Sequence, residues 1–257
     1  MNSVMQPLCA ANTPRKCCGA SAVLYDVVDF HKNCEIIRRK ILASSGIPIY
    51  YYRCPECRFI FTTAFDHFTN ADFHRYIYNE DYRLVDPDYQ EVRPRGNATF
   101  LCNLFSGAKP QRILDYGGGN GSLADLLRGA GFSQADTYDP FVPHFSAKPP
   151  HRYDCVVSFE VAEHCTDPTR TFADINNFLM DPGLIIFSTL LQPPDIDQQG
   201  LNWWYAGPRN GHASLYSRAS LEKVVQPFGL KLGSFNDGVH VLFREIPDFA
   251  KHLIKIP

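Results

Sequence analysis

The sequence predicts an α/β fold in which a doubly wound, mostly parallel sheet ends in an antiparallel hairpin. First, residues 94–257 alternate short apolar runs with segments whose apolar residues recur at helical spacing. Second, a glycine-rich turn at 117–121 lies between an apolar run and a leucine-patterned segment. Third, the triplet at 236–238, Asn-Asp-Gly, separates two apolar stretches and is a typical hairpin turn. Strands that alternate with helices form βαβ units, and such parallel sheets bind ligands beyond the carboxyl ends of their strands.

The elements follow from the local patterns. Leu101, Leu104 and Phe105 predict a short helix, and Ser122 is the expected cap of the helix after the glycine turn. No clear third strand is visible between Asp139 and the apolar run that begins at 153. The predicted order is helix 101–105, strand 112–116, helix 123–130, strand 135–139, strand 153–159, helix 172–179, strand 183–191, helix 221–228 and the hairpin strands 230–235 and 239–245.

Composition predicts a soluble globular chain with three zones. The 257 residues are 45% hydrophobic and 20% charged, and the formal net charge is −2, without a lysine or arginine block that would favour nucleic acid. The start of the chain lacks the apolar core of a signal peptide, and no run is long enough to span a membrane. We therefore expect a reducing, cytoplasmic setting. The expected zones are a flexible lead-in at 1–16, a cysteine- and aromatic-rich segment at 17–93, and an α/β domain at 94–257.

The glycine turn carries the pattern Asp115, Gly117, Gly119 and Gly121. The lysine of a P-loop is absent, and the third glycine of the dinucleotide fingerprint is replaced by serine. A carboxylate beside such a turn suits an ammonium group better than a pyrophosphate. Asp139 ends the next strand, where a carboxylate can accept both hydroxyls of a ribose. Ammonium and ribose without phosphate describe S-adenosylmethionine, and a purely structural turn is the alternative.

Four segments resemble the class I S-adenosylmethionine-dependent methyltransferases over roughly residues 94–245. They are "ILDYGGGNG", "TYDPF", "YDCVVSFEVAEHCTDP" and "GHASLYSRASLEKVVQPFGLKL". The resemblance implies that Asp115, Gly117, Gly119 and Gly121 hold the methionine part of the cofactor and that Asp139 holds its ribose. Directly after the strand that begins at 153, Phe159 and Glu160 are further candidate cofactor contacts. The family often places an adenine-binding acid after a third strand, and no residue of this chain is assigned to that role.

The motif Cys54-x-x-Cys57 is half of a tetrahedral zinc site. Free thiols and a redox pair are the alternatives, although no thioredoxin-like pattern surrounds the motif. The segment also resembles the zinc-binding N-terminal region of some sugar C-methyltransferases, which implies a structural zinc. The best ligand set is Cys18, Cys34, Cys54 and Cys57, with Cys17 or His31 as substitutes.

Methyl transfer from a sulfonium needs an aligned acceptor and, for a hydroxyl or carbon acid, a base. His212 and His164 are the candidate bases, and Glu163 and Glu160 are alternatives for proton transfer or cofactor contact. The aromatic residues Trp203, Trp204, Tyr205, Tyr76, Tyr78, Tyr82 and Tyr89 are expected either to wall a substrate cleft or to pack the interior.

The predicted function is S-adenosylmethionine-dependent methyl transfer to a small molecule. By family analogy, a nucleotide sugar or glycan precursor is the favoured acceptor. One alternative is an RNA methyltransferase whose zinc segment grips nucleic acid, with a basic stripe at 38–40 and Arg53. The other is a non-catalytic module that binds the cofactor or holds a partner.

Overall fold

The computed structural model describes residues 12–13 and 16–253. The lead-in predicted at 1–16 lies largely outside these residues. Eleven strands occur in this part of the chain. They are β1 Asn12–Thr13, β2 Ala22–Asp29, β3 Pro48–Arg53, β4 Ile60–Thr62, β5 Arg112–Tyr116, β6 Gln134–Tyr138, β7 Tyr153–Ser158, β8 Leu179–Ser188, β9 Ser214–Leu215, β10 Lys231–Ser234 and β11 Val239–Phe243.

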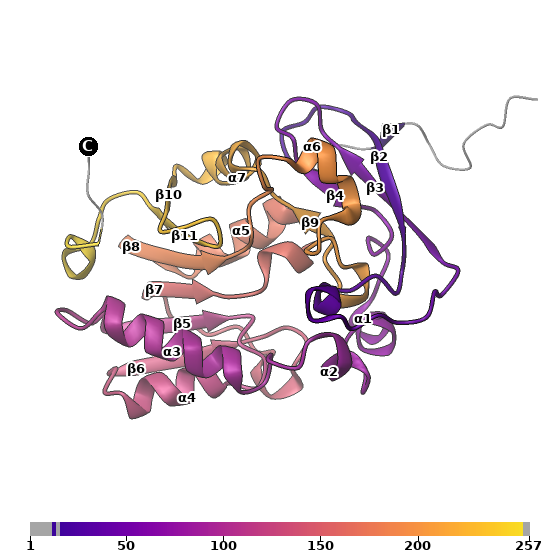
Figure 1. The fold of residues 1–257 in the computed structure, drawn as a ribbon. Coiled ribbons are helices and arrows are strands. Elements are labelled where there is room, and N and C mark those ends of the chain that lie inside the picture. Colours follow the sequence, from indigo (N-terminus) through magenta and orange to yellow (C-terminus); the bar gives the residue numbers. More distant parts are fainter. Residues whose placement is uncertain (1–11, 14–15, 254–257) are drawn as a thin grey trace, which may run out of the picture.

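The α-helices of the described residues all follow β4, and the last four lie among the later strands (Figure 1). They are α1 Asn70–Tyr76, α2 Tyr82–Val85, α3 Val92–Leu104, α4 Ser122–Gly129, α5 Pro168–Asn177, α6 Ile196–Gln199 and α7 Arg218–Val225.

The larger sheet has the order β10-β11-β8-β7-β5-β6. The neighbours from β8 to β6 are parallel, whereas β11 runs antiparallel to both β8 and β10. This arrangement confirms the mostly parallel sheet with a C-terminal antiparallel hairpin. Strand β6 is the edge of the sheet, and the segment after it forms a 3-10 turn at Pro143–Phe145 instead of a third strand.

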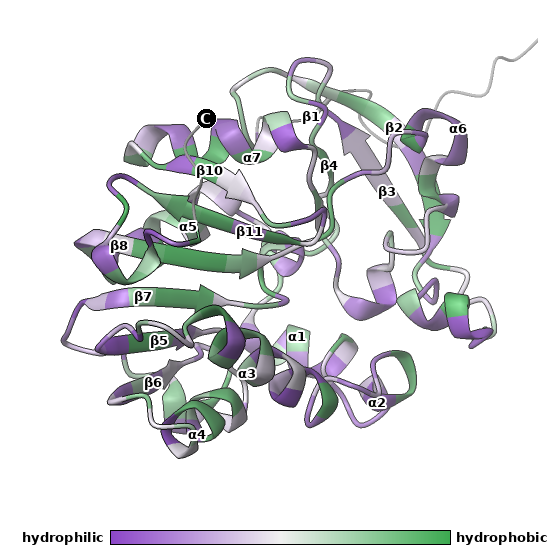
Figure 2. Ribbon diagram, turned by 60° about the vertical axis from the view of Figure 1, so that its left-hand side comes forward, coloured by the Kyte–Doolittle hydropathy of each residue, from purple (hydrophilic) through white to green (hydrophobic). Residues whose placement is uncertain are grey.

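Helices cover both faces of this sheet, which makes it doubly wound. On β5, Ile113 points into a core with Leu123 and Leu127 of α4. Its neighbour Leu114 points into the opposite core, which includes Phe172 of α5. Successive side chains on a strand alternate between faces, so a strand buried on both faces is apolar throughout. Figure 2 shows this for β7, β8 and β11, which are hydrophobic along most of their length.

Each of the four helices predicted in the α/β domain begins earlier in the structure, and α5 ends before Leu179, which is the first residue of β8. The helix predicted at 101–105 is the last part of α3, which begins at Val92. Ser122 is not the cap of α4 but its first residue, because Gly121 adopts a left-handed conformation (φ 80°) and takes the cap position. The side chain of Asn120 accepts the hydrogen bond from the Ser122 backbone N–H instead.

The smaller sheet is antiparallel and has the order β1-β2-β3-β4-β9. Its last strand comes from a distant part of the chain, since Ile60 pairs with Leu215 and Phe61 with Ser214. Figure 1 shows β9 lying beside the N-terminal strands. The turn before α7 is therefore held between the two sheets.

Candidate active site

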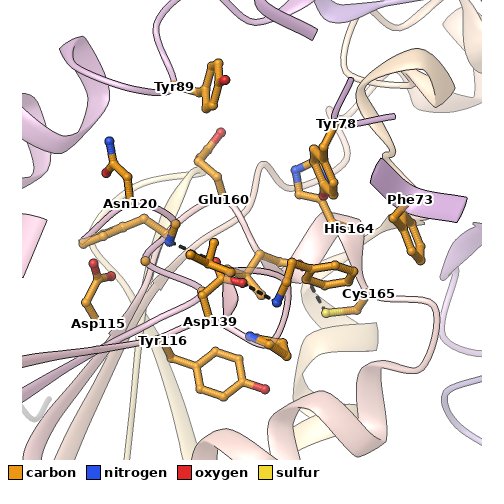
Figure 3. Close-up of a pocket in the computed structure, with 18 of the residues that line it drawn as sticks. Phe73, Tyr78, Tyr89, Asp115, Tyr116, Asn120, Asp139, Glu160, His164 and Cys165 are labelled. Carbon is orange, nitrogen blue, oxygen red and sulfur yellow. Dashed lines mark hydrogen bonds between the residues drawn. The ribbon is translucent and has the colours of Figure 1, made fainter. Parts of the chain in front are cut away.

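A pocket of about 590 Å³ opens at the carboxyl ends of β5, β6 and β7 (Figure 3). One side is lined by the glycine turn and the strand tips, and the other by aromatic residues of the segment before α3. The predicted cofactor residues that line the pocket are Asp115, Gly117, Gly119, Asp139, Phe159 and Glu160. Gly121 is outside this lining.

Backbone conformation favours glycine at three positions of the turn, and at two of them space requires it as well. Gly117 has a φ of 75°, and a Cβ there would lie 2.3 Å from Cγ2 of Val161. Gly121 has a φ of 80°, and its Cβ would lie 2.7 Å from the Phe145 ring. Gly119 also has a positive φ (57°), but a Cβ there would meet no atom within 4 Å. A positive φ disfavours side chains, so the turn brings bare backbone to the pocket.

Asp115 is buried at the tip of β5, and its Oδ2 atom has no hydrogen-bond partner among the described residues. Burial, with a smaller contribution from the charge of Asp139, raises the pKa of Asp115 to about 7. A buried acid of this kind would gain from a cationic ligand.

Asp139 follows β6 and holds two segments of the pocket wall. Its Oδ2 accepts from the backbone N–H of Gly119 (2.9 Å), and its Oδ1 accepts from that of Phe141 (2.8 Å). These bonds orient the carboxylate, and each oxygen keeps a further lone pair for a ligand hydroxyl.

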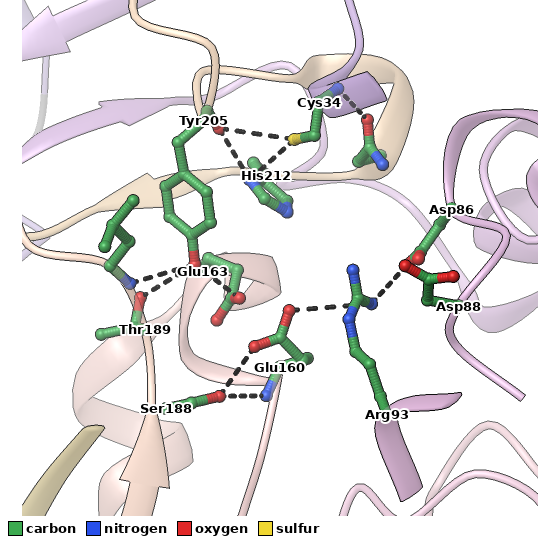
Figure 4. Close-up of polar contacts among 12 residues, drawn as sticks. Cys34, Asp86, Asp88, Arg93, Glu160, Glu163, Ser188, Thr189, Tyr205 and His212 are labelled. Carbon is green, nitrogen blue, oxygen red and sulfur yellow. Dashed lines mark hydrogen bonds and ion pairs between the residues drawn. The ribbon is translucent and has the colours of Figure 1, made fainter. Parts of the chain in front are cut away.

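Glu160 follows β7 with a φ of 56°, a strained conformation for a residue that is not glycine. The hydroxyl of Ser188 fixes it, accepting from the Glu160 backbone N–H and donating to its Oε1, both at 2.8 Å (Figure 4). Oε2 lies 3.7 Å from Nη1 of Arg93, which also pairs with Oδ2 of Asp86 at 2.7 Å. Both Arg93 and Asp86 line the pocket.

Sequence reasoning missed Arg93 and Asp86. They lie in the aromatic segment that precedes the recognisable motifs, and only the fold brings them to the pocket. The sequence signal that could have identified them is an acid and an arginine in a segment rich in tyrosine.

The structure brings the three catalytic candidates together, and we call Glu163, His164 and His212 the His–Glu cluster. One potential ligand atom of each lies within 4.8 Å of the others. The pairing of elements explains this, because the Ala213 backbone N–H donates to the Glu163 carbonyl at 2.8 Å. The two imidazole rings meet edge to face, with centroids 4.9 Å apart.

Within the cluster, His164 lines the pocket, while His212 and Glu163 lie outside its lining and are buried. The Tyr205 hydroxyl donates to Oε1 of Glu163 at 2.6 Å, and Oε2 is buried without a partner among the described residues. Burial, then the charge of Glu160, raises the pKa of Glu163 to about 8. Burial, then the charge of Arg93, lowers the pKa of His164 to about 4, so its ring is neutral near pH 7.

The aromatic candidates divide between wall and core. Tyr78, Tyr82 and Tyr89 line the pocket, with Phe73 and Phe141. Tyr76 points to solvent, with 42% of its surface exposed. Trp203 and Tyr205 belong to the core beneath the smaller sheet, and the partly buried Trp204 packs against it.

The structure brings three of the four predicted zinc ligands together. Cys18, Cys54 and Cys57 form the thiol cluster, in which the Cys18 and Cys54 sulfurs are 3.4 Å apart. Cys17 lies beside them: its thiol donates to the Ser220 carbonyl at 3.4 Å, and its side chain is the largest cause of the raised pKa of Cys57.

Cys34 is not part of the thiol cluster, which corrects its assignment as a ligand. Its sulfur lies 3.7 Å from Nδ1 of His212, because the side chain of Asn210 accepts from the Cys34 backbone and anchors it there. His31 is also elsewhere, with its Nδ1 2.6 Å from the Ala43 carbonyl. Of the two substitutes, only Cys17 lies beside the cluster.

Comparison with known proteins identifies the family. The family Methyltransf_23, described as a methyltransferase domain, matches residues 89–234, more than half of the chain. The chain belongs to this family. It is an S-adenosylmethionine-dependent methyltransferase. A search of curated proteins gives no match.

Solved structures match the chain at low sequence identity. An O-methyltransferase family protein from Burkholderia thailandensis is 14% identical with a TM-score of 0.50, and the match covers 68% of this chain and 62% of that protein. The magnesium protoporphyrin IX methyltransferase of Synechocystis PCC 6803 is 15% identical with a TM-score of 0.44, and the match covers 61% of this chain and 84% of that protein.

Within the described residues, none of the helices has the length and apolarity needed to cross a bilayer.

Proposed function

We propose that the chain methylates a small molecule and that a nucleotide sugar or glycan precursor is the favoured acceptor class. The observation that carries this proposal is a single pocket with two different sides. The glycine turn and two acids form a side suited to the donor, and Phe73, Tyr78 and Tyr89 form a side suited to stacking on a ring. The sugar class also rests on the resemblance of the cysteine segment.

For the donor, we assign the ammonium group to the side of Asp115 and the ribose hydroxyls to Asp139. The buried, unpartnered Oδ2 of Asp115 supports the first assignment. The second is supported by the way two backbone N–H groups orient the Asp139 carboxylate at the strand tip. Phe159 and Glu160 border the same space at the end of β7.

Removal of the acceptor proton is assigned to the His–Glu cluster. His164 is the member that faces the pocket, and its ring is neutral near pH 7, so one nitrogen has a lone pair that can accept a proton. His212 and Glu163 contact His164 on its buried side, away from the pocket. His164→Gln should lower kcat while leaving donor affinity unchanged. Unchanged turnover would contradict the assignment.

The test of the acceptor class is product identification. The full chain is incubated with donor carrying a labelled methyl group and with fractionated cell metabolites. Label should appear in the sugar-nucleotide fraction. Label in another small-molecule fraction would overturn the sugar class, and label only in RNA would overturn a small-molecule acceptor.

We further propose that the thiol cluster binds a structural zinc, with Cys17 as the fourth ligand. Sulfurs around tetrahedral zinc lie about 3.8 Å apart, since each Zn–S bond is about 2.3 Å. The 3.4 Å between Cys18 and Cys54 is close to this value. A hydrogen bond from the Arg58 N–H to the Cys54 carbonyl (3.0 Å) closes the backbone turn at Cys54. This turn directs the thiols of Cys54 and Cys57 toward the thiol cluster.

The zinc proposal is tested by replacing both Cys54 and Cys57 with serine. Metal content by mass spectrometry and the melting temperature should both fall, because a structural metal contributes directly to folding. Cys102→Ser, at a half-buried position on α3, is the matched control and should retain the metal. Unchanged metal content in the double variant would overturn the proposal.

A further inference from the structure

The His–Glu cluster has the composition of a metal centre as well as that of a base. Its potential ligand atoms are one carboxylate oxygen and two imidazole nitrogens, all within 4.8 Å of one another. Ligand atoms around tetrahedral zinc lie about 3.4 Å apart, given bonds of about 2.1 Å. Small side-chain rotations would bring the ligand atoms from this separation to the distance found around zinc.

A hydrogen bond behind the cluster determines which nitrogen of His212 is free to bind a metal. Nδ1 of His212 lies 2.7 Å from the Tyr205 carbonyl oxygen, which can only accept, so Nδ1 carries the hydrogen. The Nε2 atom of His212 therefore keeps its lone pair. Metal-binding histidines usually donate their second N–H to a carbonyl or carboxylate in this way.

Glu163 supplies the negative charge. The Tyr205 hydroxyl binds its Oε1 at 2.6 Å, whereas Oε2 is buried and unpartnered among the described residues. The side chain is fully buried, and an uncompensated carboxylate in such a place is costly. Arg93, the cation labelled in Figure 4, is already paired with Asp86 and Glu160. A cation at the cluster would satisfy the free oxygen.

We propose that Glu163, His164 and His212 bind a divalent transition-metal ion of the zinc type at the edge of the methyl-transfer pocket. Two imidazoles favour zinc, cobalt or iron over magnesium. The cluster has three protein ligands, and His164 faces the pocket, so a fourth position would be open to a ligand. Three ligands and an open position are typical of catalytic zinc, whereas the thiol cluster resembles a closed structural site.

This inference rests on the proposed methyl transfer and replaces one part of it, because the ion takes the place of the imidazole base. In the metal-bound protein the imidazoles are ligands, and the ion lowers the pKa of an acceptor hydroxyl bound at the open position. The O–H proton leaves to water, the donor S–CH₃ bond breaks and an O–CH₃ bond forms. No electron transfer is involved.

Cobalt(II) titration of the metal-free full chain tests the inference, because the two sites differ in their spectra. Thiolate-bound cobalt gives intense ligand-to-metal bands in the near ultraviolet together with visible bands, whereas a nitrogen and oxygen site adds only weak visible absorption. The number of bound ions is therefore measured along with the spectrum. The expected result for the unmodified chain is two bound ions, one of each spectral type.

Three variants locate the second ion. Glu163→Gln and His164→Gln should each remove one bound ion and leave the near-ultraviolet thiolate bands intact. Tyr205→Phe, which removes only the supporting hydroxyl, should weaken cobalt binding at this site about 10- to 100-fold. Asp86→Asn changes a buried pocket acid outside the cluster and should retain both ions.

Binding of thiolate-bound cobalt alone would overturn the inference, and so would a second site that is unchanged in both Glu163→Gln and His164→Gln. Donor affinity and turnover are measured on the same samples. Turnover without a second ion would leave the proposed function standing. A second ion without methyl transfer to any acceptor fraction would count against the proposed function and leave the metal site standing.

Discussion

Replacing Asp115 by asparagine should make the ligand-free protein more stable at alkaline pH and weaken its binding of the donor. The carboxyl has an ordinary pKa of 3.8, which burial and then Asp139 raise to about 7 in the folded state. Between these two values the unfolded chain binds fewer protons than the folded protein, so stability falls as pH rises. Asparagine keeps the shape of the side chain and removes this dependence.

The magnitude follows from the shift. One pKa unit corresponds to 1.36 kcal/mol, so a displacement of roughly three units destabilises the folded protein by about 4 kcal/mol above pH 7. At pH 5 the same displacement costs only about 1.7 kcal/mol, because the folded carboxyl is still protonated. The stability difference between Asp115→Asn and the unmodified chain should therefore grow by about 2–3 kcal/mol between pH 5 and pH 8.

Urea unfolding at several pH values measures this difference, and calorimetry measures donor affinity on the same proteins. Donor affinity of the unmodified chain should increase as pH rises through 7, because the ionised carboxylate is the form that attracts an ammonium group. The variant should bind the donor about 10- to 100-fold more weakly at pH 8 and without this pH dependence, which corresponds to the loss of one charge-assisted bond. A stability difference that is constant with pH, or equal donor affinity, would refute the reasoning.

Three further predictions concern the same pocket. Asp139→Ala removes the acceptor of two backbone hydrogen bonds and should weaken donor binding about 100-fold, measured by calorimetry. Asp139→Asn should weaken donor binding less. Equal donor affinity in the alanine variant would contradict the ribose assignment. Gly117→Ala should lower the free energy of unfolding by about 1–3 kcal/mol in urea unfolding. Adding Val161→Ala should recover only the part of this loss that comes from the clash with the Val161 side chain, since the positive φ at residue 117 remains. Arg93→Met should destabilise the chain by about 1–3 kcal/mol in urea unfolding by leaving Asp86 unpaired, and a second change, Asp86→Asn, should restore most of the loss.

Local patterns were sufficient for the larger sheet because its strands are buried on both faces and its helices carry one apolar face. The acids at the strand tips were predictable for a related reason. Asp115 and Asp139 end neighbouring parallel strands, so the topology places them on the same edge. The residues of the His–Glu cluster were found from their positions after strands, although their mutual contact depends on β9.

The features that sequence reasoning missed depend on contacts between distant segments. Spacing made Cys34 a plausible zinc ligand, but a bond from its backbone to Asn210 holds it against His212. Arg93 and Asp86 reach the pocket only after α3 packs on the sheet. Ser122 lost its expected capping role because the left-handed Gly121 moves the start of the helix.

The pairing of β4 with β9 has a consequence for how the chain is assembled during synthesis. Ile60 emerges from the ribosome long before its partner Leu215, so the smaller sheet stays incomplete until most of the polypeptide has been made. The hydroxyl of Ser217 likewise reaches the Cys57 carbonyl, at 2.6 Å, only at that late point. A nascent chain therefore presents an open strand edge to chaperones while the parallel sheet forms, and exchanging residues 17–93 between homologues would separate two halves of one sheet.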